Sequence, residues 1–248
     1  MKKVFYTEKQ PIKAAIATAL SKALAIISSG KTEVGTIILL FPTYASADEA
    51  LDDIFPQANI ASHRYHCEEP SCGILIETLK NYSASFPHIL IPIFISEKDL
   101  ARFEDEYNAL VWVVVPPDMS QMENWLKIHS AVNVDTKQAL EYDGTINERV
   151  INAIEWLRAT SYPNEGFVHP LDLNRLKSMA NALATNQVPV DYYSVLHYCI
   201  THKINHEGGR MIADHFVKAQ TRKFKTDGNY SITFLTEMMN SKHTQGMV

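Results

Sequence analysis

Residues 34–46, VGTIILLFPTYAS, hold an apolar run that ends in a short polar turn. Ser46 stands three residues ahead of Glu49, a spacing typical of a helix N-terminus, where a hydroxyl and a carboxylate bond free N–H groups. Runs that are apolar on both faces indicate strands covered by helices on both sides. We therefore expect parallel strands joined by right-handed helical crossovers. The same order recurs in two further places: the run 89–95 before Ser96, and the run 109–115 before Ser120.

Weaker patterns complete the first half of the chain. Apolar residues at steps of three and four predict an amphipathic helix over residues 12–27, with Gly30 as its stop. Pro92 lacks a ladder N–H and favours an edge strand or a bulge. Residues 1–145 are thus predicted to form an α/β domain, a Rossmann-like three-layer parallel sheet. Three further elements are expected here: a strand over 59–66, a helix over 73–82 and a short strand over 131–134.

The second half, residues 146–248, is predicted to be a mainly helical domain. Asp227-Gly228 between alternating residues is a hairpin signal over residues 223–234. Helices followed by a hairpin are typical of a winged-helix module, although residues 234–239 equally suit the start of a last helix. The expected helices cover 146–160, 171–184, 190–202 and 207–224.

Composition excludes several classes of protein. The 248 residues are 46% hydrophobic and 21% charged, as in ordinary globular chains. No apolar run approaches the roughly 20 residues that span a bilayer, and the N-terminus lacks the apolar stretch of an export signal. Three cysteines, an odd number, argue against a disulfide framework. We therefore expect a cytoplasmic protein with no membrane partner.

Known cofactor motifs are not matched. Residues 25–32 resemble a phosphate-binding loop, but a helix precedes them and a strand follows, the reverse of the order that such a loop needs. The turn 42–46 lacks the glycines of a dinucleotide fingerprint. His63, His66, Cys67 and Cys72 are zinc-ligand types at a poor spacing. We predict no cofactor and no metal.

Position indicates where a site would lie, because ligands of open parallel sheets bind beyond the carboxyl ends of the strands. The turns expected at that edge carry hydroxyls, carboxylates and one histidine, but no cation to neutralise a phosphate. The candidate catalytic residues are His66, Ser96 and Asp118, and the candidate ligand-binding residues are Thr43, Tyr44, Ser46, Glu68 and Glu97.

Charge indicates a different partner for the second half. Residues 196–248 hold seven basic and four acidic side chains, whereas residues 40–118 hold four and thirteen. A nucleic acid would therefore contact the C-terminal part. The leading hypothesis is a non-enzymatic binding or regulatory protein whose α/β domain senses a ligand or partner. The alternative is a hydrolase or nuclease. A third hypothesis is a structural or assembly role, in which a protein partner docks on the helix 12–27. The candidate nucleic-acid contacts are Arg210, Lys218, Arg222, Lys223 and Lys225.

Overall fold

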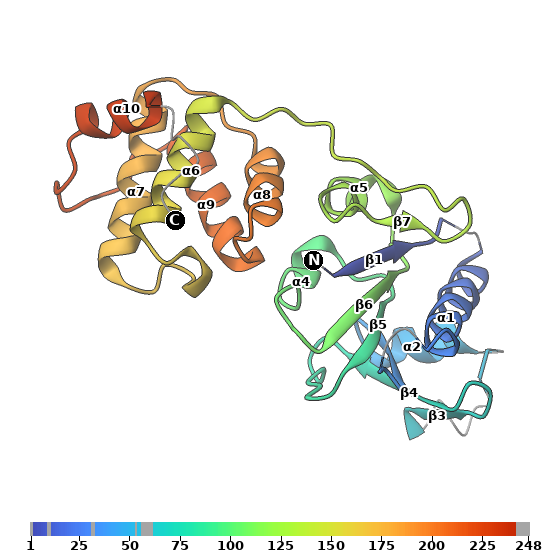
Figure 1. The fold of residues 1–248 in the computed structure, drawn as a ribbon. Helices are drawn as coiled ribbons and strands as arrows, with labels where there is room; N and C mark the ends of the chain where they lie inside the picture. The colour runs from blue at the N-terminus through green and yellow to red at the C-terminus, as the bar shows by residue number, and fades with distance from the viewer. Residues whose placement is uncertain (1, 9–10, 31–32, 53, 56–61, 242–248) are drawn as a thin grey trace. The chain divides into compact units, whose positions relative to one another are not determined.

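The structure is a computed structural model that describes residues 2–8, 11–30, 33–52, 54–55 and 62–241. The chain divides into two compact units, residues 1–142 and 143–248. Figure 1 shows a strand-rich first unit and a helical second unit, which we describe separately. No helix among the described residues is long and apolar enough to cross a membrane.

The first unit is built on a seven-stranded sheet in the order β3-β4-β2-β5-β6-β1-β7. Every neighbouring pair is parallel except β3 and β4. The α/β class and the largely parallel sheet are therefore confirmed. The strands are β1 (Lys3–Tyr6), β2 (Thr36–Phe41), β3 (Arg64–Cys67), β4 (Cys72–Thr78), β5 (His88–Pro92), β6 (Ala109–Val114) and β7 (Val132–Asn133).

Both faces of the sheet are buried, which explains the continuous apolar runs. On one face, α1 (Ile12–Ser28) and α2 (Tyr44–Leu51) pack against side chains such as Leu39 and Ile91. On the other face, α4 (Glu97–Leu100) and α5 (Met119–Ile128) pack against Leu40 and Trp112. Alternate residues of one strand thus enter two separate cores.

Three predictions in the first unit are wrong. Residues 73–82 do not form a helix, because Cys72–Thr78 alternates between buried and half-buried positions as β4. β3 overlaps the strand predicted over 59–66 but is antiparallel to β4, so the parallel direction that placed His66 at the carboxyl edge is wrong; residues 59–61 lie outside those described. Pro92 ends β5, which is an interior strand and not an edge strand, and the register shift between β5 and β6 lies at His88/Ile89, away from Pro92.

The second unit contains five α-helices among its described residues, and none of those residues forms a strand. The gap between the helices predicted over 190–202 and 207–224 is present, because one helix ends at Thr201 and the next begins at His206. The helices are α6 (Glu148–Thr160), α7 (Pro170–Thr185), α8 (Tyr192–Thr201), α9 (His206–Ala219) and α10 (Ile232–Asn240), with a short 3₁₀ turn η1 (Pro163–Glu165).

The hairpin predicted over 223–234 is absent, and the alternative of a last helix, α10, is found instead. Residues 222–230, hereafter the strap, run along α7. The buried amide of Asn181 bonds both backbone groups of Phe224 at 2.9 Å, and the Asn174 carbonyl oxygen accepts from the N–H of Asp227 at 3.0 Å. Because asparagine side chains satisfy these backbone groups, the strap needs no partner strand. The β-hairpin that a winged helix requires is therefore absent from the described residues, and the winged-helix prediction is not confirmed.

Candidate functional site

The turns at the carboxyl edge of the parallel strands are occupied by helix caps. The Thr43 hydroxyl accepts a hydrogen bond from the N–H of Ser46, whose hydroxyl accepts from the N–H of Thr43, both at 3.2 Å. Because Thr43 caps α2, the helix begins two residues before the predicted Ser46 cap. Tyr44 stacks on His63 with ring centroids 3.9 Å apart. The predicted ligand-binding hydroxyls are therefore already bonded within the fold.

The next two turns are built the same way. Ser96 caps α4 and donates from its hydroxyl to Asp99 Oδ2 at 2.7 Å, next to Glu97 in the first helical turn. Asp118, rather than the predicted Ser120, caps α5; its Oδ1 accepts from the N–H and the hydroxyl of Ser120, both at 2.9 Å. Both residues lie at the predicted edge, where their side chains stabilise helix starts.

His66 and Glu68 lie at the opposite edge of the sheet. His66 pairs with Gly73 at the beginning of β4, and Glu68 follows in the turn to Cys72. The prediction that these residues share an edge with Asp118 is wrong, because it assumed a parallel strand. An antiparallel strand ends where its parallel neighbours begin. The three candidate catalytic residues therefore do not meet.

At the carboxyl edge, the described residues line a small hollow. A hollow of about 50 Å³ lies between the ends of β1, β5 and β6 and the start of α1. Ligand pockets are usually roughly 300 Å³ or more, so this hollow suits ordered water better than a ligand. Its lining includes Thr7, Glu8, Phe94, Pro116 and Asp118.

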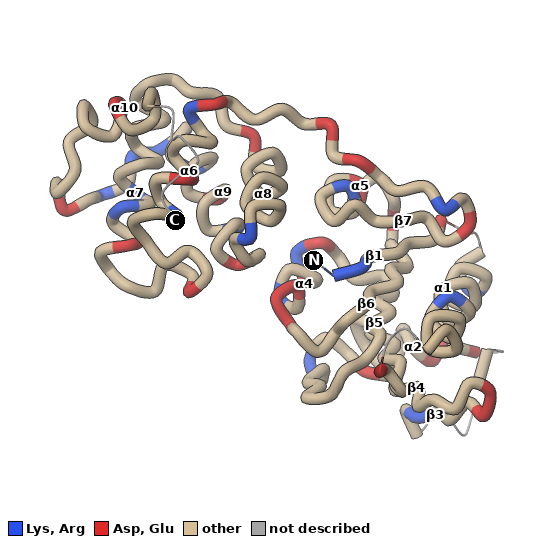
Figure 2. Tube along the Cα trace, in the orientation of Figure 1, with Lys and Arg blue, Asp and Glu red and all other residues tan. Residues whose placement is uncertain are grey.

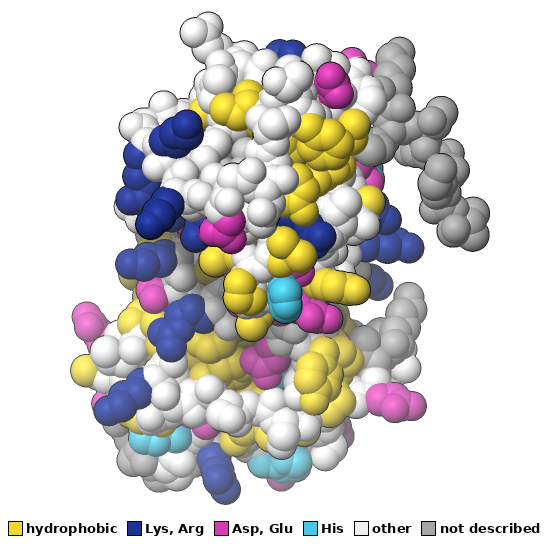
Figure 3. Space-filling view, turned by 90° about the vertical axis from the view of Figure 1, so that its left-hand side faces the viewer, with side chains coloured by type: hydrophobic (Ala, Val, Ile, Leu, Met, Phe, Trp, Pro, Cys, Tyr) yellow, Lys and Arg dark blue, Asp and Glu magenta, His cyan; other side chains and the backbone are white. Residues whose placement is uncertain are grey.

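In the second unit, the cations at the end of α9 and on the strap are exposed. Arg222, Lys223 and Lys225 are exposed and form no ion pair with a described residue. Lys218 pairs with Asp214 at 2.9 Å on the surface of α9, and Arg210 is half-buried on the same helix. Figure 2 marks these charged positions along the trace, and Figure 3 shows Lys and Arg side chains on the surface.

His215 on α9 lies next to Phe224 of the strap. Its Nδ1–H donates to the Met211 carbonyl at 2.8 Å, and its ring lies 5.0 Å from that of Phe224. Burial lowers the pKa of His215, and the nearby cations Lys218 and Lys177 lower it further. The bond to the Met211 carbonyl and the Asp214 carboxylate act in the opposite direction and raise this pKa.

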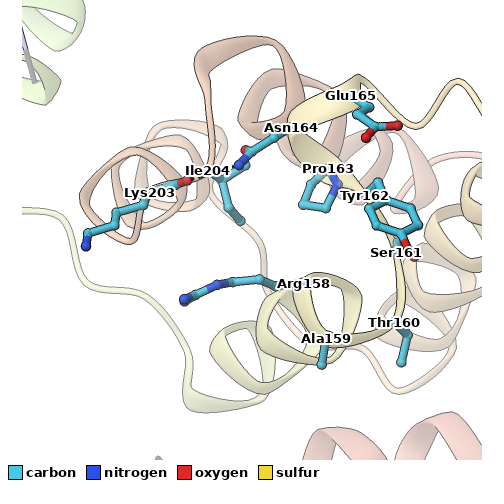
Figure 4. Close-up of a pocket in the computed structure, with 10 residues that line it drawn as sticks. All are labelled: Arg158, Ala159, Thr160, Ser161, Tyr162, Pro163, Asn164, Glu165, Lys203 and Ile204. Carbon is cyan, nitrogen blue, oxygen red and sulfur yellow. Dashed lines mark hydrogen bonds between the residues drawn. The ribbon is translucent and has the colours of Figure 1, made fainter. Parts of the chain in front are cut away.

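Sequence reasoning missed a hollow in the second unit that is lined by two cations. It measures about 360 Å³ and lies between the end of α6, η1 and the turn from α8 to α9. Figure 4 shows Arg158 and Lys203 extending from two walls toward the same side, while Glu165 points away. Lys203 has a left-handed backbone (φ 66°), and its carbonyl accepts from Asn164 Nδ2 at 3.4 Å. Arg158 on α6 and Lys203 in the turn from α8 to α9 are 45 positions apart in the sequence, so they form no linear motif.

Comparison with known proteins gives no relative: no protein-family model, no curated protein and no solved structure matches this chain.

Proposed function

We propose that this is a binding protein whose second unit contacts nucleic acid through the strap and the end of α9. The single observation that carries the proposal is the display of Arg222, Lys223 and Lys225 as exposed cations that are free of ion pairs with the described residues. Unpaired cations on a short segment are what the phosphate backbone of a nucleic acid attracts.

The anchoring of the strap supports this role. Phe224 is half-buried between the exposed Lys223 and Lys225, and its backbone is held by Asn181 on both sides. At the other end of the strap, Arg175 Nε donates to the Tyr230 hydroxyl at 2.9 Å. A fixed backbone lowers the conformational entropy lost when the lysines engage phosphates.

The mode of contact follows from the burial of α9. Ile212, Ala213 and Phe216 are buried in the core of the unit, and Asp214 lies on the outer face. Because the exposed Asp214 carboxylate would repel phosphate, we assign α9 no base-reading role in a groove, and expect its end and the strap to bind phosphates with little sequence preference. The sensing role of the α/β unit stays a prediction.

The hydrolase alternative has no geometric basis, because it required His66, Ser96 and Asp118 to act together. Two of them cap helices at one edge of the sheet, and His66 is on an exposed position of β3 at the other edge.

Fluorescence anisotropy with a labelled mixed-sequence duplex, repeated from low to high salt, tests the proposal. We expect micromolar binding that weakens steeply with salt, and an affinity lower by about tenfold or more in the triple variant Arg222→Gln, Lys223→Gln, Lys225→Gln. The slope of log K against log salt should also become shallower by roughly 0.9 for each phosphate that the variant no longer neutralises.

A matched variant separates a local effect from net charge. Lys80, Lys98 and Arg102 are exposed cations of the first unit, and replacing all three by Gln changes the net charge by the same amount. We expect this variant to bind as the unaltered chain does. Salt-insensitive binding, or equal weakening in the two triple variants, would refute the assignment to the strap.

A further inference from the structure

The hollow at the end of α6 has the walls of a ligand site. Arg158 and Lys203 supply two cations from different segments, and both are exposed at the opening. Arg158 Nη1 lies 3.3 and 3.4 Å from the two carboxylate oxygens of Glu155, a weak surface pair that leaves the rest of its guanidinium fork accessible. Lys203 forms no ion pair with any residue that the structure describes. These two positive side chains therefore favour the binding of an anion in the hollow.

A second observation is independent of charge. Ser161 lines the same hollow and is only 7% exposed, yet its hydroxyl has no hydrogen-bond partner among the described residues. A buried hydroxyl without a partner costs free energy unless water or a ligand satisfies it. Its neighbour is already bonded, since the Thr160 hydroxyl donates to the Trp156 carbonyl at 2.8 Å.

The third wall is aromatic. The Tyr162 side chain lines the hollow and is 66% exposed, although most large apolar side chains of this unit are buried. An exposed ring across the hollow from two cations is a surface on which a flat ring stacks while an attached anion is held on the other side. Glu165, the acidic side chain that also lines the hollow, points away from it (Figure 4).

The wall of the hollow formed by η1 is held in place by hydrogen bonds. Asn164 Oδ1 accepts from the N–H of Asn205 at 2.8 Å, and the Asn164 carbonyl accepts from Asn205 Nδ2 at 2.9 Å. These bonds join η1 to the start of α9. The hollow is therefore shaped by the fold before any ligand binds.

We propose that this hollow binds a small phosphate monoester carried on a planar ring, with a nucleoside monophosphate as the representative ligand. Arg158 and Lys203 hold the phosphate and Tyr162 stacks on the ring, while the Ser161 hydroxyl, which is covered from solvent here, reaches the ligand by rotating about its Cα–Cβ bond. This site is separate from the strap and does not depend on the nucleic-acid proposal.

Isothermal titration calorimetry of the full chain with adenosine 5′-monophosphate tests the site. We expect saturable one-to-one binding, and an affinity lower by about tenfold or more in Arg158→Gln combined with Lys203→Gln, because each change removes a charge-assisted hydrogen bond. Adenosine without phosphate should bind at least about tenfold more weakly for the same reason. No saturable binding of the monophosphate at millimolar concentration, or equal binding of adenosine, would overturn the proposal.

Two further measurements test the role of Tyr162 and control for the loss of positive charge. Tyr162→Ala should weaken the nucleotide but leave ribose 5-phosphate unchanged, and if both ligands weaken equally the stacking role is wrong. Lys225→Gln is the matched charge control, since it lies on the strap; it should leave nucleotide affinity unchanged while weakening duplex binding. Thermal unfolding of each variant should coincide with that of the unaltered chain, because the altered side chains are exposed.

Discussion

The side-chain amide of Asn181 pairs with the main chain of Phe224, donating to its carbonyl oxygen and accepting from its N–H, each at 2.9 Å. Removing the amide leaves two backbone groups unpaired in a largely buried place. We expect Asn181→Ala to lower the free energy of unfolding by about 2 to 4 kcal/mol, measured by urea denaturation. Asn229→Ala, an exposed change on the same strap, should stay within about 0.5 kcal/mol. Equal effects of the two changes would contradict the anchoring role.

Gly208 lies where α9 meets η1. A Cβ built on Gly208 would stand 2.1 Å from the carbonyl oxygen of Pro163, a backbone atom that cannot rotate away. We expect Gly208→Ala to destabilise the chain by about 3 kcal/mol and to weaken nucleotide binding, because Pro163 lines the proposed site.

Gly35→Ala is the control for Gly208→Ala, since a Cβ at Gly35 would meet nothing within 4 Å. Its effect should remain below about 1 kcal/mol. Thermal and urea unfolding measure both changes, and a tolerated Gly208→Ala would contradict the close approach of α9 to η1.

Asp118 is expected to act as a cap and not as a catalyst. Asp118→Ala should cost about 1 kcal/mol of stability, because the N–H of Ser120 loses its acceptor. Asp118→Asn keeps an amide oxygen at the same place and should cost a few tenths of a kcal/mol at most. Chemical denaturation distinguishes these outcomes, and a large destabilisation in the Asn variant would instead indicate that the negative charge is needed.

Stability should fall below neutral pH because of His88. This residue is fully buried; its Nδ1–H donates to the Phe86 carbonyl at 2.8 Å, and its Nε2 accepts from the Tyr82 hydroxyl at 2.7 Å. These bonds suit the neutral ring, and burial lowers its pKa from the ordinary 6.5. The unfolded chain therefore binds the proton more readily, so this stabilisation is complete above pH 6.5 and is lost as pH falls toward the folded pKa.

Urea unfolding at pH 7.5 and pH 5.5 measures that decrease in stability. The variant His88→Gln should be less stable overall but less sensitive to pH, while His66→Gln, on an exposed position, should keep the original pH dependence. A pH dependence unchanged in His88→Gln would assign the effect to other groups.

The interior strands were predictable because burial on both faces requires continuous apolar residues. Residues 36–41 and 109–114 carry that pattern, and the helix at 12–28 carries a clear 3.6-residue period. The Cys72–Thr78 strand also shows its alternation in the sequence, with Cys72, Ile74 and Ile76 on one face, and reading it as a helix was an avoidable error.

Other features could not be read from local pattern. The four-residue strand Lys3–Tyr6 pairs only through partners more than 100 residues away. The direction of Arg64–Cys67 depends on its hairpin with Cys72, and that direction alone moved His66 to the other edge. The hollow between Arg158 and Lys203 arises where the end of α6, η1 and the turn from α8 to α9 pack together, so no single segment reveals it.

The sheet is bounded by β3, with four residues, and β7, with two. A longer, flatter margin would expose a row of unbonded amide and carbonyl groups onto which another molecule could add its own strand. Such brief margins offer few positions for that addition. The strongly apolar strands, which could otherwise drive self-association, therefore lie inside the sheet. A neighbouring copy cannot pair with them at its edge.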